Sequence, residues 1–356
     1  MSSNTRIATD DPPWVWNGTV PSLNGLRALA ILSVMASHYN RQFEGSWVIG
    51  HFGVTSFFVI SGFLITLLLI RERKRTENVS LIGFYKRRAL RILPAYFMFL
   101  FAMYLLHVAG ILRTSAFSWL VALTYTSCFF AMKMDHHLSH TWSLSVEEHF
   151  YFLWPLLFRW TRPKTAVIIL MVLLLINPVL RYVLYRLANP ILDIDYSTPA
   201  QMGNIAVGCL IAFLVTGGCF PRLLDLLQRH PLKWMSAGIL MILVSVVSLR
   251  QHLAIHHALS DPARSAAFGL IMLGLLYSHP TNLVNRFLNS GPLNWIGILS
   301  YSLYLWQQPI IREHARIPGG IPASMLLLLG IACASYYLIE SPFLRLKQKR
   351  LNAQRV

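Results

Sequence analysis

The sequence predicts an all-α fold, a polytopic integral membrane bundle of about ten transmembrane helices plus one segment that is re-entrant or only partly inserted. Composition is the first reason, because 55% of the 356 residues are hydrophobic and 13% are charged, whereas a soluble domain carries about a quarter charged residues. The mean hydropathy is +0.51. The second reason is that apolar stretches recur over 23–40, 50–70, 92–111, 115–132, 148–160, 166–185, 202–217, 234–249, 265–278, 294–311 and 321–340.

The basic residues give the third reason and predict the orientation. The chain has 31 Lys and Arg against 14 Asp and Glu. The basic runs lie in short loops beside apolar stretches, which is where the positive-inside rule places them. The 71–91 loop, the 159–164 and 222–233 segments and the tail are therefore expected to be cytoplasmic, as are both termini. This interpretation assigns the charge to topology and predicts no nucleic-acid partner.

Eleven spans cannot begin and end on the same side of a membrane, so one stretch is expected not to cross. The best candidate is 115–132, which is rich in Ser and Thr and lacks a clear basic flank; 148–160 is also short. Non-helical backbone at that depth needs cover from protein or from a watery cavity. With ten crossings, the 187–200 and 251–262 loops are external. Their acidic residues are Asp193, Asp195 and Asp261.

Three parts are expected along the chain, a cytoplasmic N-terminal segment at 1–20, a membrane domain at 21–343 and a basic cytoplasmic tail at 344–356. The N-terminal segment lacks the charged and apolar regions of a cleavable signal, so the first spanning helix is expected to direct insertion. The cysteines are far apart and form no C-x-x-C pair, which predicts neither a disulfide framework nor a metal site. They are Cys128, Cys209, Cys219 and Cys333.

The stretch at 21–40 holds one cation, Arg27, and one imidazole, His38, with no acid between them. Eleven positions are close to three helical turns, so both side chains project from the same side, about 16 Å apart along the axis. Ionisable groups inside a membrane helix usually face a polar cavity or a pathway. The alternative is that Arg27 snorkels to the headgroups and His38 lies at the opposite interface.

Two further motifs suggest a donor site. Ser61 and Gly62 are small residues in an apolar helix, where they let a neighbouring helix, or alternatively an acyl chain, come close to the backbone. Arg88 and Arg91 are three positions apart at the mouth of the 92–111 stretch, so they share a helix face and could grip one phosphate group together. The alternative for each arginine is a topology anchor.

Two adjacent acids, Glu147 and Glu148, open an apolar segment without a neighbouring Lys or Arg. We expect them on the outer side, where a carboxylate could fix the tautomer of His38 and steady its protonated form, as in general-base catalysis. Because they point about 100° apart, only one is expected to face the site. A purely structural interaction with the helix dipole is the alternative. Trp142 and Ser143 precede them and are expected to line the acceptor side of the cavity.

A polar stripe lies within the 294–311 stretch. Tyr301 and Tyr304 are three apart on one helix face, and Gln307 continues the row. Such a stripe usually lines a cavity, and anchoring of aromatic rings at the membrane interface is the alternative. Glu340 ends the final stretch, where we expect a helix stop with an acid near Arg345.

Six motifs together resemble the membrane acyltransferase-3 family, bacterial O-acyltransferases that modify surface and secreted polysaccharides. They occur in family order between residues 21 and 343, and they are LNGLRALAILSVMASHY, FFVISGFLIT, YKRRALRILPAYF, TWSLSVEEHFYFLWP, ILSYSLYLWQQP and LIESPF.

The resemblance implies roles for the residues that match. The histidine at His38 would be the catalytic base, and the arginine at Arg27 would be essential. The R-x-x-R pair, Arg88 and Arg91, would be associated with the acyl-CoA donor, and the motif that contains Glu147 would be associated with activity. Two positions depart from the family. His149 stands where Gln is usual, and Gln307 stands where many members have His, which implies that no histidine is required there or that acceptor binding differs.

The resemblance implies an O-acyltransferase of the bacterial cytoplasmic (inner) membrane. It would move an acyl group, with acetyl expected, from cytoplasmic acyl-CoA to a hydroxyl of a carbohydrate acceptor such as O-antigen, exopolysaccharide or another glycan or glycolipid. Acyl-CoA (acetyl-CoA) is then a co-substrate, and no bound cofactor is expected. We expect no fused extracytoplasmic hydrolase-like domain, so a relay to such a domain would use a separate protein.

In the expected mechanism His38, held by Glu147, takes the proton of the acceptor hydroxyl, while Arg27 or a nearby donor steadies the oxyanion. The alternatives are a membrane transporter and a non-catalytic membrane partner that use the same polar intramembrane cavity.

Overall fold

The computed structural model describes residues 20, 22–40, 46–187, 191–216, 221–247 and 254–346. Cys219, the N-terminal segment up to residue 19 and the tail from residue 347 lie outside these ranges. Within them every regular element is a helix, which confirms the all-α prediction. The longer helices are α2 (Leu23–Tyr39), α3 (Ser46–Thr76), α4 (Leu81–Val108), α8 (Thr141–Trp160), α9 (Pro163–Leu187), α10 (Thr198–Val215), α12 (Pro231–Val247), α13 (Ala254–Tyr277), α15 (Gly291–Arg312) and α16 (Gly320–Ala334). The shorter ones are α5 (Ala116–Leu123), α6 (Ser127–Phe130), η1 (Ala131–Lys133), α7 (His136–Ser139), α11 (Pro221–Arg229), α14 (Leu283–Leu288), η3 (His314–Arg316) and η4 (Ser335–Glu340).

Six helices of the described chain are long and apolar enough to cross a membrane, so the structure supports a multi-pass membrane protein but does not confirm the predicted count of about ten spans. They are Val48–Thr76, Leu81–Val108, Pro163–Leu187, Thr198–Val215, Ala258–Tyr277 and Gly320–Leu346. The predicted spans that fall short do so for physical reasons. Helices α2 and α12 have 17 residues each, and the polar side chains of α8 and α15 lower their hydropathy.

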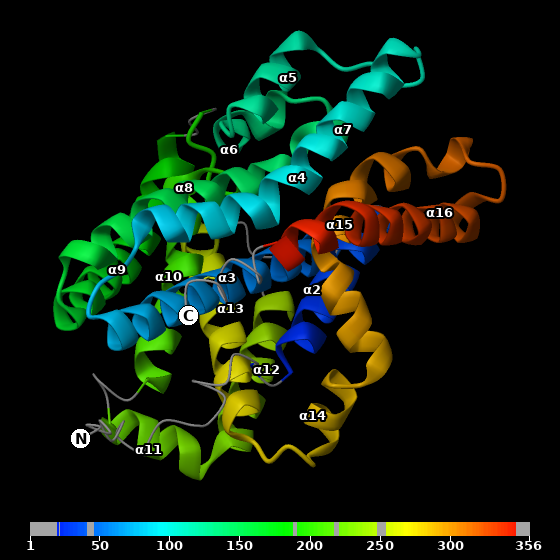
Figure 1. Cartoon of the computed structure of the whole chain (residues 1–356). Helices are drawn as coiled ribbons and strands as arrows, with labels where there is room; N and C mark the ends of the chain where they lie inside the picture. Colours follow the sequence, from blue (N-terminus) through cyan, green and yellow to red (C-terminus); the bar gives the residue numbers. More distant parts are fainter. Residues whose placement is uncertain are drawn as a thin grey trace.

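Helix α3 runs through the middle of the bundle, with α9 on one side and α16 on the other (Figure 1). In the apolar windows of α3 and α10, 72% and 78% of the residues are buried, against 28% in α9 and 22% in the helix that begins at Gly320. The outer helices therefore turn large apolar side chains outward, as a lipid-facing surface requires.

Helices α3 and α10 cross in very close contact at two glycines. A Cβ on Gly62 would lie 2.0 Å from the carbonyl oxygen of Ile205, and a Cβ on Gly208 would lie 1.9 Å from that of Val59. Small residues that allow backbones to approach are the common device for packing membrane helices. Gly62 therefore serves helix packing, which was the structural alternative for this position.

Helices α2 and α15 lie side by side and run in the same direction. Near their first turns, Gly297 packs against the backbone of Asn24. Near their last turns, His38 hydrogen-bonds Gln307. Residues at matching positions along α2 and α15 therefore lie at the same depth in the bundle.

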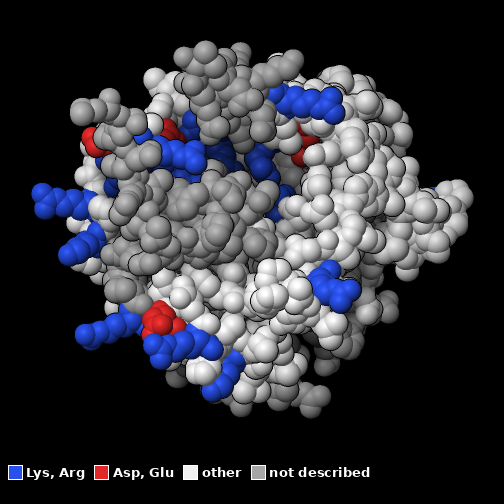
Figure 2. Space-filling view, turned by 60° about the horizontal axis from the view of Figure 1, so that its bottom comes forward, with Lys and Arg blue, Asp and Glu red and all other residues white. Residues whose placement is uncertain are grey.

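One end of the bundle is rich in Lys and Arg, with few Asp or Glu and with some cations set back in a hollow (Figure 2). The last turns of α3, α8 and α10 meet there, because Arg73 donates to the carbonyl of Thr161 and Lys74 to that of Thr216. We call this the basic end, and we call the end where His38 lies the distal end.

The stretch predicted not to cross, 115–132, is broken into short helices at the distal end. The longest, α5, has eight residues and is therefore about 12 Å long, too short to span a bilayer. A left-handed residue, Tyr125 with φ 54°, lies between α5 and α6. Asp135 ties the segment together by accepting hydrogen bonds from Ser115 and Ser118.

Candidate active site

A cavity of about 910 Å³ opens at the basic end and reaches into the bundle between α2, α3, α4, α8 and α15. Its mouth is lined by cations at the end of α3 and the start of α4, including Arg71, Arg75 and Arg87. Glu72 neutralises one of them through an ion pair with Arg87 at 2.7 Å. Apolar side chains such as Phe57 line its walls, so the cavity suits a ligand with an anionic head and an uncharged arm.

Three predicted arginines converge on this cavity. Arg88 and Arg91 both line it from α4, and Arg27 lines it from α2. Arg88 lies over the ring of Tyr151, 5.1 Å from its centroid, a favourable cation–π contact. No salt bridge joins any of the three to a described carboxylate, so the nearby acids act on them only from a longer distance and their hydrogen-bond donors can still contact an anionic ligand.

Both acids of the Glu147–Glu148 pair line the cavity, so the expectation that only one could face the site is wrong. The cavity is wide enough to meet both sides of one helical turn of α8. Glu147 accepts a hydrogen bond of 2.5 Å from Ser61 Oγ, which lies 3.0 Å from the hydroxyl of Tyr151. Ser61 is thereby fixed against the acid, and it also lines the cavity.

Glu340 belongs to the same region, although the sequence predicted it as a helix stop near Arg345. It lies in the π-helical turn η4, is 5% exposed and accepts a hydrogen bond from Ser302. Its charge and that of Glu147 both act on Arg27. Glu340 does not line the cavity itself, but its π-helical turn is an element that often occurs at functional sites. The signal in the sequence was the match of LIESPF to the family pattern.

His38 lies at the distal end of α2, where it hydrogen-bonds Gln307 of α15. The distance from Nδ1 to Oε1 is 2.6 Å. Because an amide oxygen only accepts, Nδ1 of His38 donates this hydrogen bond and carries a ring proton. Gln307 is completely buried, so the ring is held by a rigid neighbour. The predicted polar row on α15 thus continues to Gln307, which reaches His38 rather than the cavity.

The predicted pairing of His38 with Glu147 is therefore wrong. Glu147 bonds Ser61 and lies among the arginines, whereas an amide takes the place beside His38. The cause is the position of Glu147 along the bundle axis. Glu147 lies at the level of Arg27, and Arg27 and His38 are about 16 Å apart along α2. The same distance removes Arg27 from the oxyanion position at His38 and leaves it at the cavity of the basic end.

A hydrogen-bonded layer separates the cavity from the level of His38. Tyr304 lines the cavity one turn before Gln307, and Ser143 lines it from α8. The hydroxyl of Tyr304 lies 2.6 Å from Ser143 Oγ and donates to the carbonyl of His140 at 3.1 Å. Tyr301, the remaining predicted tyrosine, lines the cavity and donates to the carbonyl of Ile92 at 3.0 Å. Any group that reaches His38 from the cavity has to pass this layer.

Trp142 does not line the cavity. It is 8% exposed and packs edge-on against Phe58 and Tyr196. Its role in the described structure is to wedge α8 against α3 and the 191–197 segment.

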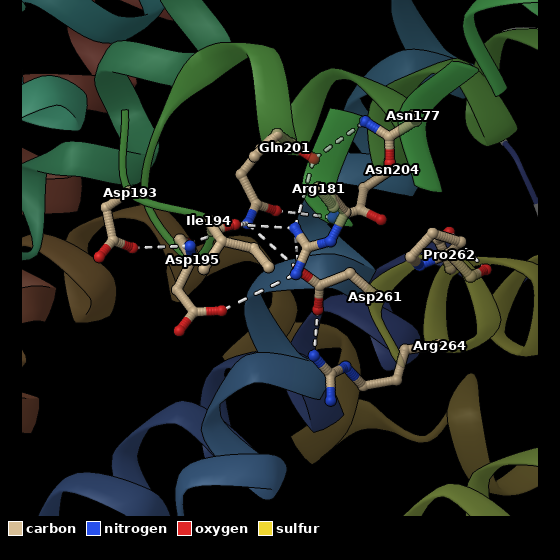
Figure 3. A network of polar contacts seen from close by, with 12 residues as sticks. Asn177, Arg181, Asp193, Ile194, Asp195, Gln201, Asn204, Asp261, Pro262 and Arg264 are labelled. Carbon is tan, nitrogen blue, oxygen red and sulfur yellow. Dashed lines mark hydrogen bonds and ion pairs between the residues drawn. The ribbon is translucent and has the colours of Figure 1, made fainter. Parts of the chain in front are cut away.

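A second polar cluster, which sequence reasoning missed, is buried near the distal end (Figure 3). Arg181 of α9 pairs with Asp261 of α13 at 2.8 Å, and Arg264 also pairs with Asp261. All three are at most 2% exposed. Asp261 is therefore a core residue of the bundle and not the external loop residue that the sequence predicted. Arg181, an arginine inside an apolar stretch, was the signal that could have found it.

This cluster fastens the 191–197 segment to the bundle. Arg181 donates to the carbonyl of Ile194 at 2.8 Å, and Gln201 donates both to the carbonyl of Asp195 at 2.9 Å and to Asp261 at 3.2 Å. Burial, together with the nearby charge of Asp261, raises the pKa of Asp195 to about 7. Near neutral pH, Asp261 is consequently the carboxylate that balances Arg181 most fully.

The comparisons with known proteins identify the family of the chain. The model of the acyltransferase-3 family, described as an acyltransferase domain, matches residues 20–313. The O-acetyltransferase OatA of Staphylococcus aureus strain NCTC 8325 is 30% identical over 353 residues, covering 91% of this chain and 57% of the relative. The peptidoglycan O-acetyltransferase OatA of Listeria monocytogenes is 32% identical over 317 residues, covering 82% of this chain and 49% of the relative.

A putative peptidoglycan O-acetyltransferase of Bacillus subtilis, YrhL, is 28% identical over 354 residues, covering 91% of this chain and 54% of the relative. The chain thus spans about half the length of the curated relatives it matches. No solved structure matches. The family model extends over most of the chain, from the segment before α2 to the end of α15, and it includes every predicted site residue. The chain therefore belongs to the acyltransferase-3 family of membrane acyltransferases.

Proposed function

We propose that the chain moves an acetyl group from acetyl-CoA, bound in the arginine-lined cavity, to a hydroxyl of a cell-wall glycan at the distal end. The observation that carries the proposal is the convergence of Arg27, Arg88 and Arg91 on one cavity, with no salt bridge from any of them to a described carboxylate. Guanidinium groups bind phosphate through paired charge-assisted hydrogen bonds. Coenzyme A offers several phosphate groups on one end and an uncharged arm on the other, which matches a cationic mouth and apolar walls.

Orientation follows from the charge. The basic end faces the cytoplasm under the positive-inside rule, so both termini are cytoplasmic and the donor enters from the side where coenzyme A is made. His38 then faces the outer half of the bilayer, where a surface glycan is accessible. The uncharged arm carries the thioester about 16 Å, from the level of Arg27 to that of His38, and the contact between Tyr304 and Ser143 has to open for it to pass.

His38 Nε2 takes the proton of the acceptor hydroxyl, and the oxygen attacks the thioester carbonyl. The new C–O bond forms as the C–S bond breaks, and the proton on His38 passes to the departing thiolate, which gives free coenzyme A. Gln307 steadies the imidazolium through its hydrogen bond to Nδ1. Glu147, Glu148 and Glu340 lie with the arginines, where they balance the cavity when it is empty.

The acceptor class rests on the relatives, two of which are named as peptidoglycan O-acetyltransferases, one of them as putative. Peptidoglycan is accordingly the first acceptor to test, before O-antigen or exopolysaccharide. The family match favours an enzyme over the transporter and the non-catalytic partner.

The test is mass spectrometry of cell-wall glycan from cells with the gene, without it, and with His38→Ala. Cells with the gene should show a glycan mass increased by one acetyl group, and deletion should remove it. His38→Ala should reduce acetylation by about 10² to 10⁴ at unchanged protein abundance, as loss of a general base does. The exposed His230→Ala is the matched control. Normal acetylation in a well-expressed His38→Ala strain would contradict the mechanism.

A further inference from the structure

A second cavity, of about 590 Å³, lies at the basic end and shares no lining residue with the donor cavity. It is formed where the last turns of α3, α8 and α10 meet the start of α9. Its inner surface is apolar, with Ile70, Phe158 and Phe213 at most 7% exposed. Such a surface suits a hydrocarbon chain.

The rim of this cavity is cationic. Its charged residues are Arg73, Lys74, Arg162 and Lys164, and no Asp or Glu is among the described residues that line it. Arg73 is already engaged, since it donates to the carbonyls of Thr161 and Phe158 and lies 4.0 Å above the Phe158 ring. Arg162 and Lys164 are exposed and make no hydrogen bond or ion pair within the described chain. Their charge is available to a ligand.

The cavity lies at the depth of the lipid headgroups. The neighbouring Trp160, at the end of α8, is 72% exposed, and exposed tryptophans at helix ends mark the membrane–water interface. Along α9, which leaves the cavity, Ile168 and Leu175 are 61% and 72% exposed, as expected of a side that faces lipid tails. A lipid can therefore enter sideways, with its headgroup at the rim and its chain on the apolar surface.

We propose that this cavity binds an anionic phospholipid, with the phosphate between Arg162 and Lys164 and an acyl chain over Ile70, Phe158 and Phe213. Charge selects the class of occupant, because a zwitterionic headgroup brings a cation of its own to a rim without acids. The apolar surface selects a lipid over a free phosphate ion. Basic pockets between membrane helices on the cytoplasmic side recognise anionic headgroups on the same physical grounds. This proposal is independent of the acyltransfer chemistry.

The experiment is native mass spectrometry of the full chain purified in detergent and titrated with phosphatidylglycerol or phosphatidylcholine. The intact protein should retain phosphatidylglycerol and retain phosphatidylcholine weakly. Arg162→Gln/Lys164→Gln should weaken retention on the order of tenfold or more, since each cation near an anionic headgroup contributes about fivefold. The matched control is Arg222→Gln/Lys233→Gln, which removes two exposed cations from the same end outside the cavity, and it should retain lipid normally.

A second variant separates the cavity from the charge. Thr165→Trp places a large ring at the exposed rim, keeps all four cations and should also abolish retention. Equal retention in all variants would overturn the proposal. Equal loss in the test and control double variants would show diffuse charge attraction only, and displacement of the lipid by inorganic phosphate would show a simple anion site. Either of these outcomes also overturns it.

Discussion

At the scale of single residues, the candidate site divides into two groups at different heights. Arg27, Arg88 and Arg91 lie with the acids around the donor cavity, and His38 lies with Gln307 beyond it. Under the function proposed above, the first group binds the donor and the second acts on the acceptor proton, so variants of the two groups should differ in their kinetic effects.

Gln307→Leu should lower the acetylation rate by about 10- to 100-fold with little change in the apparent Michaelis constant for acetyl-CoA. The reason is that the variant removes the acceptor for the Nδ1 proton, and a hydrogen bond to a charged group contributes about 1.5–3 kcal/mol. Gln307→Glu keeps an acceptor and should restore most of the rate. The measurement is steady-state acetyl transfer in proteoliposomes. If Leu and Glu were equally slow, Gln307 would be a packing residue only.

The double variant Arg88→Lys/Arg91→Lys should raise the apparent Michaelis constant for acetyl-CoA while leaving the maximal rate nearly unchanged. Lysine keeps the charge but loses the planar guanidinium that grips a phosphate at two points. Direct binding of coenzyme A to the purified protein provides a readout without turnover. Arg222→Lys, outside the cavity, is the control. Unchanged donor affinity would reduce the pair to topology anchors.

At the scale of helices, the close crossing of α3 and α10 allows a direct test of the packing. Gly62→Ala forces a methyl group against the carbonyl of Ile205 and should cost about 1–3 kcal/mol. Gly330→Ala is the matched control, because nothing lies within 4 Å of a Cβ there, and a helical Gly→Ala change in open space is neutral or stabilising by up to about 1 kcal/mol. Thermal unfolding in detergent should separate the two variants. Equal midpoints would mean that the crossing is looser than described.

Many of the helices could be predicted from the sequence. Hydrophobic runs predicted the helices, and the Ser and Thr content of 115–132 pointed to one stretch that forms no spanning helix. Three-residue spacing correctly placed Arg88 with Arg91 and Tyr301 with Tyr304. The failures concern relations between helices. Neither the height of Glu147 against His38 nor the inward turn of Glu340 is visible in a local pattern, because both depend on how α8 and η4 are shifted along α2. The sequence analysis placed Asp261 in an external loop because its partner Arg181 lies 80 positions away, and no local pattern connects the two.

At the scale of the whole molecule, the function proposed above requires the two ends to face different compartments. In a background with its four cysteines replaced by Ser, Thr76→Cys should react with a membrane-impermeant maleimide only after permeabilisation. Lys133→Cys should react in intact cells. Lys133 is an exposed residue near the distal end and is therefore accessible to the reagent. Labelling of both positions from one side would refute the arrangement.

The Tyr304–Ser143–His140 layer has a consequence for the cell that is separate from catalysis. A hydrated cavity that extended from one end of the bundle to the other would conduct ions and discharge the membrane potential, at about 2.3 kcal/mol per charge for every 100 mV. The layer closes the inner end of the cavity with hydrogen-bonded side chains and the buried ring of Tyr304. A membrane enzyme built in this way can hold a polar donor within the bilayer without letting ions leak across the membrane and discharge its potential.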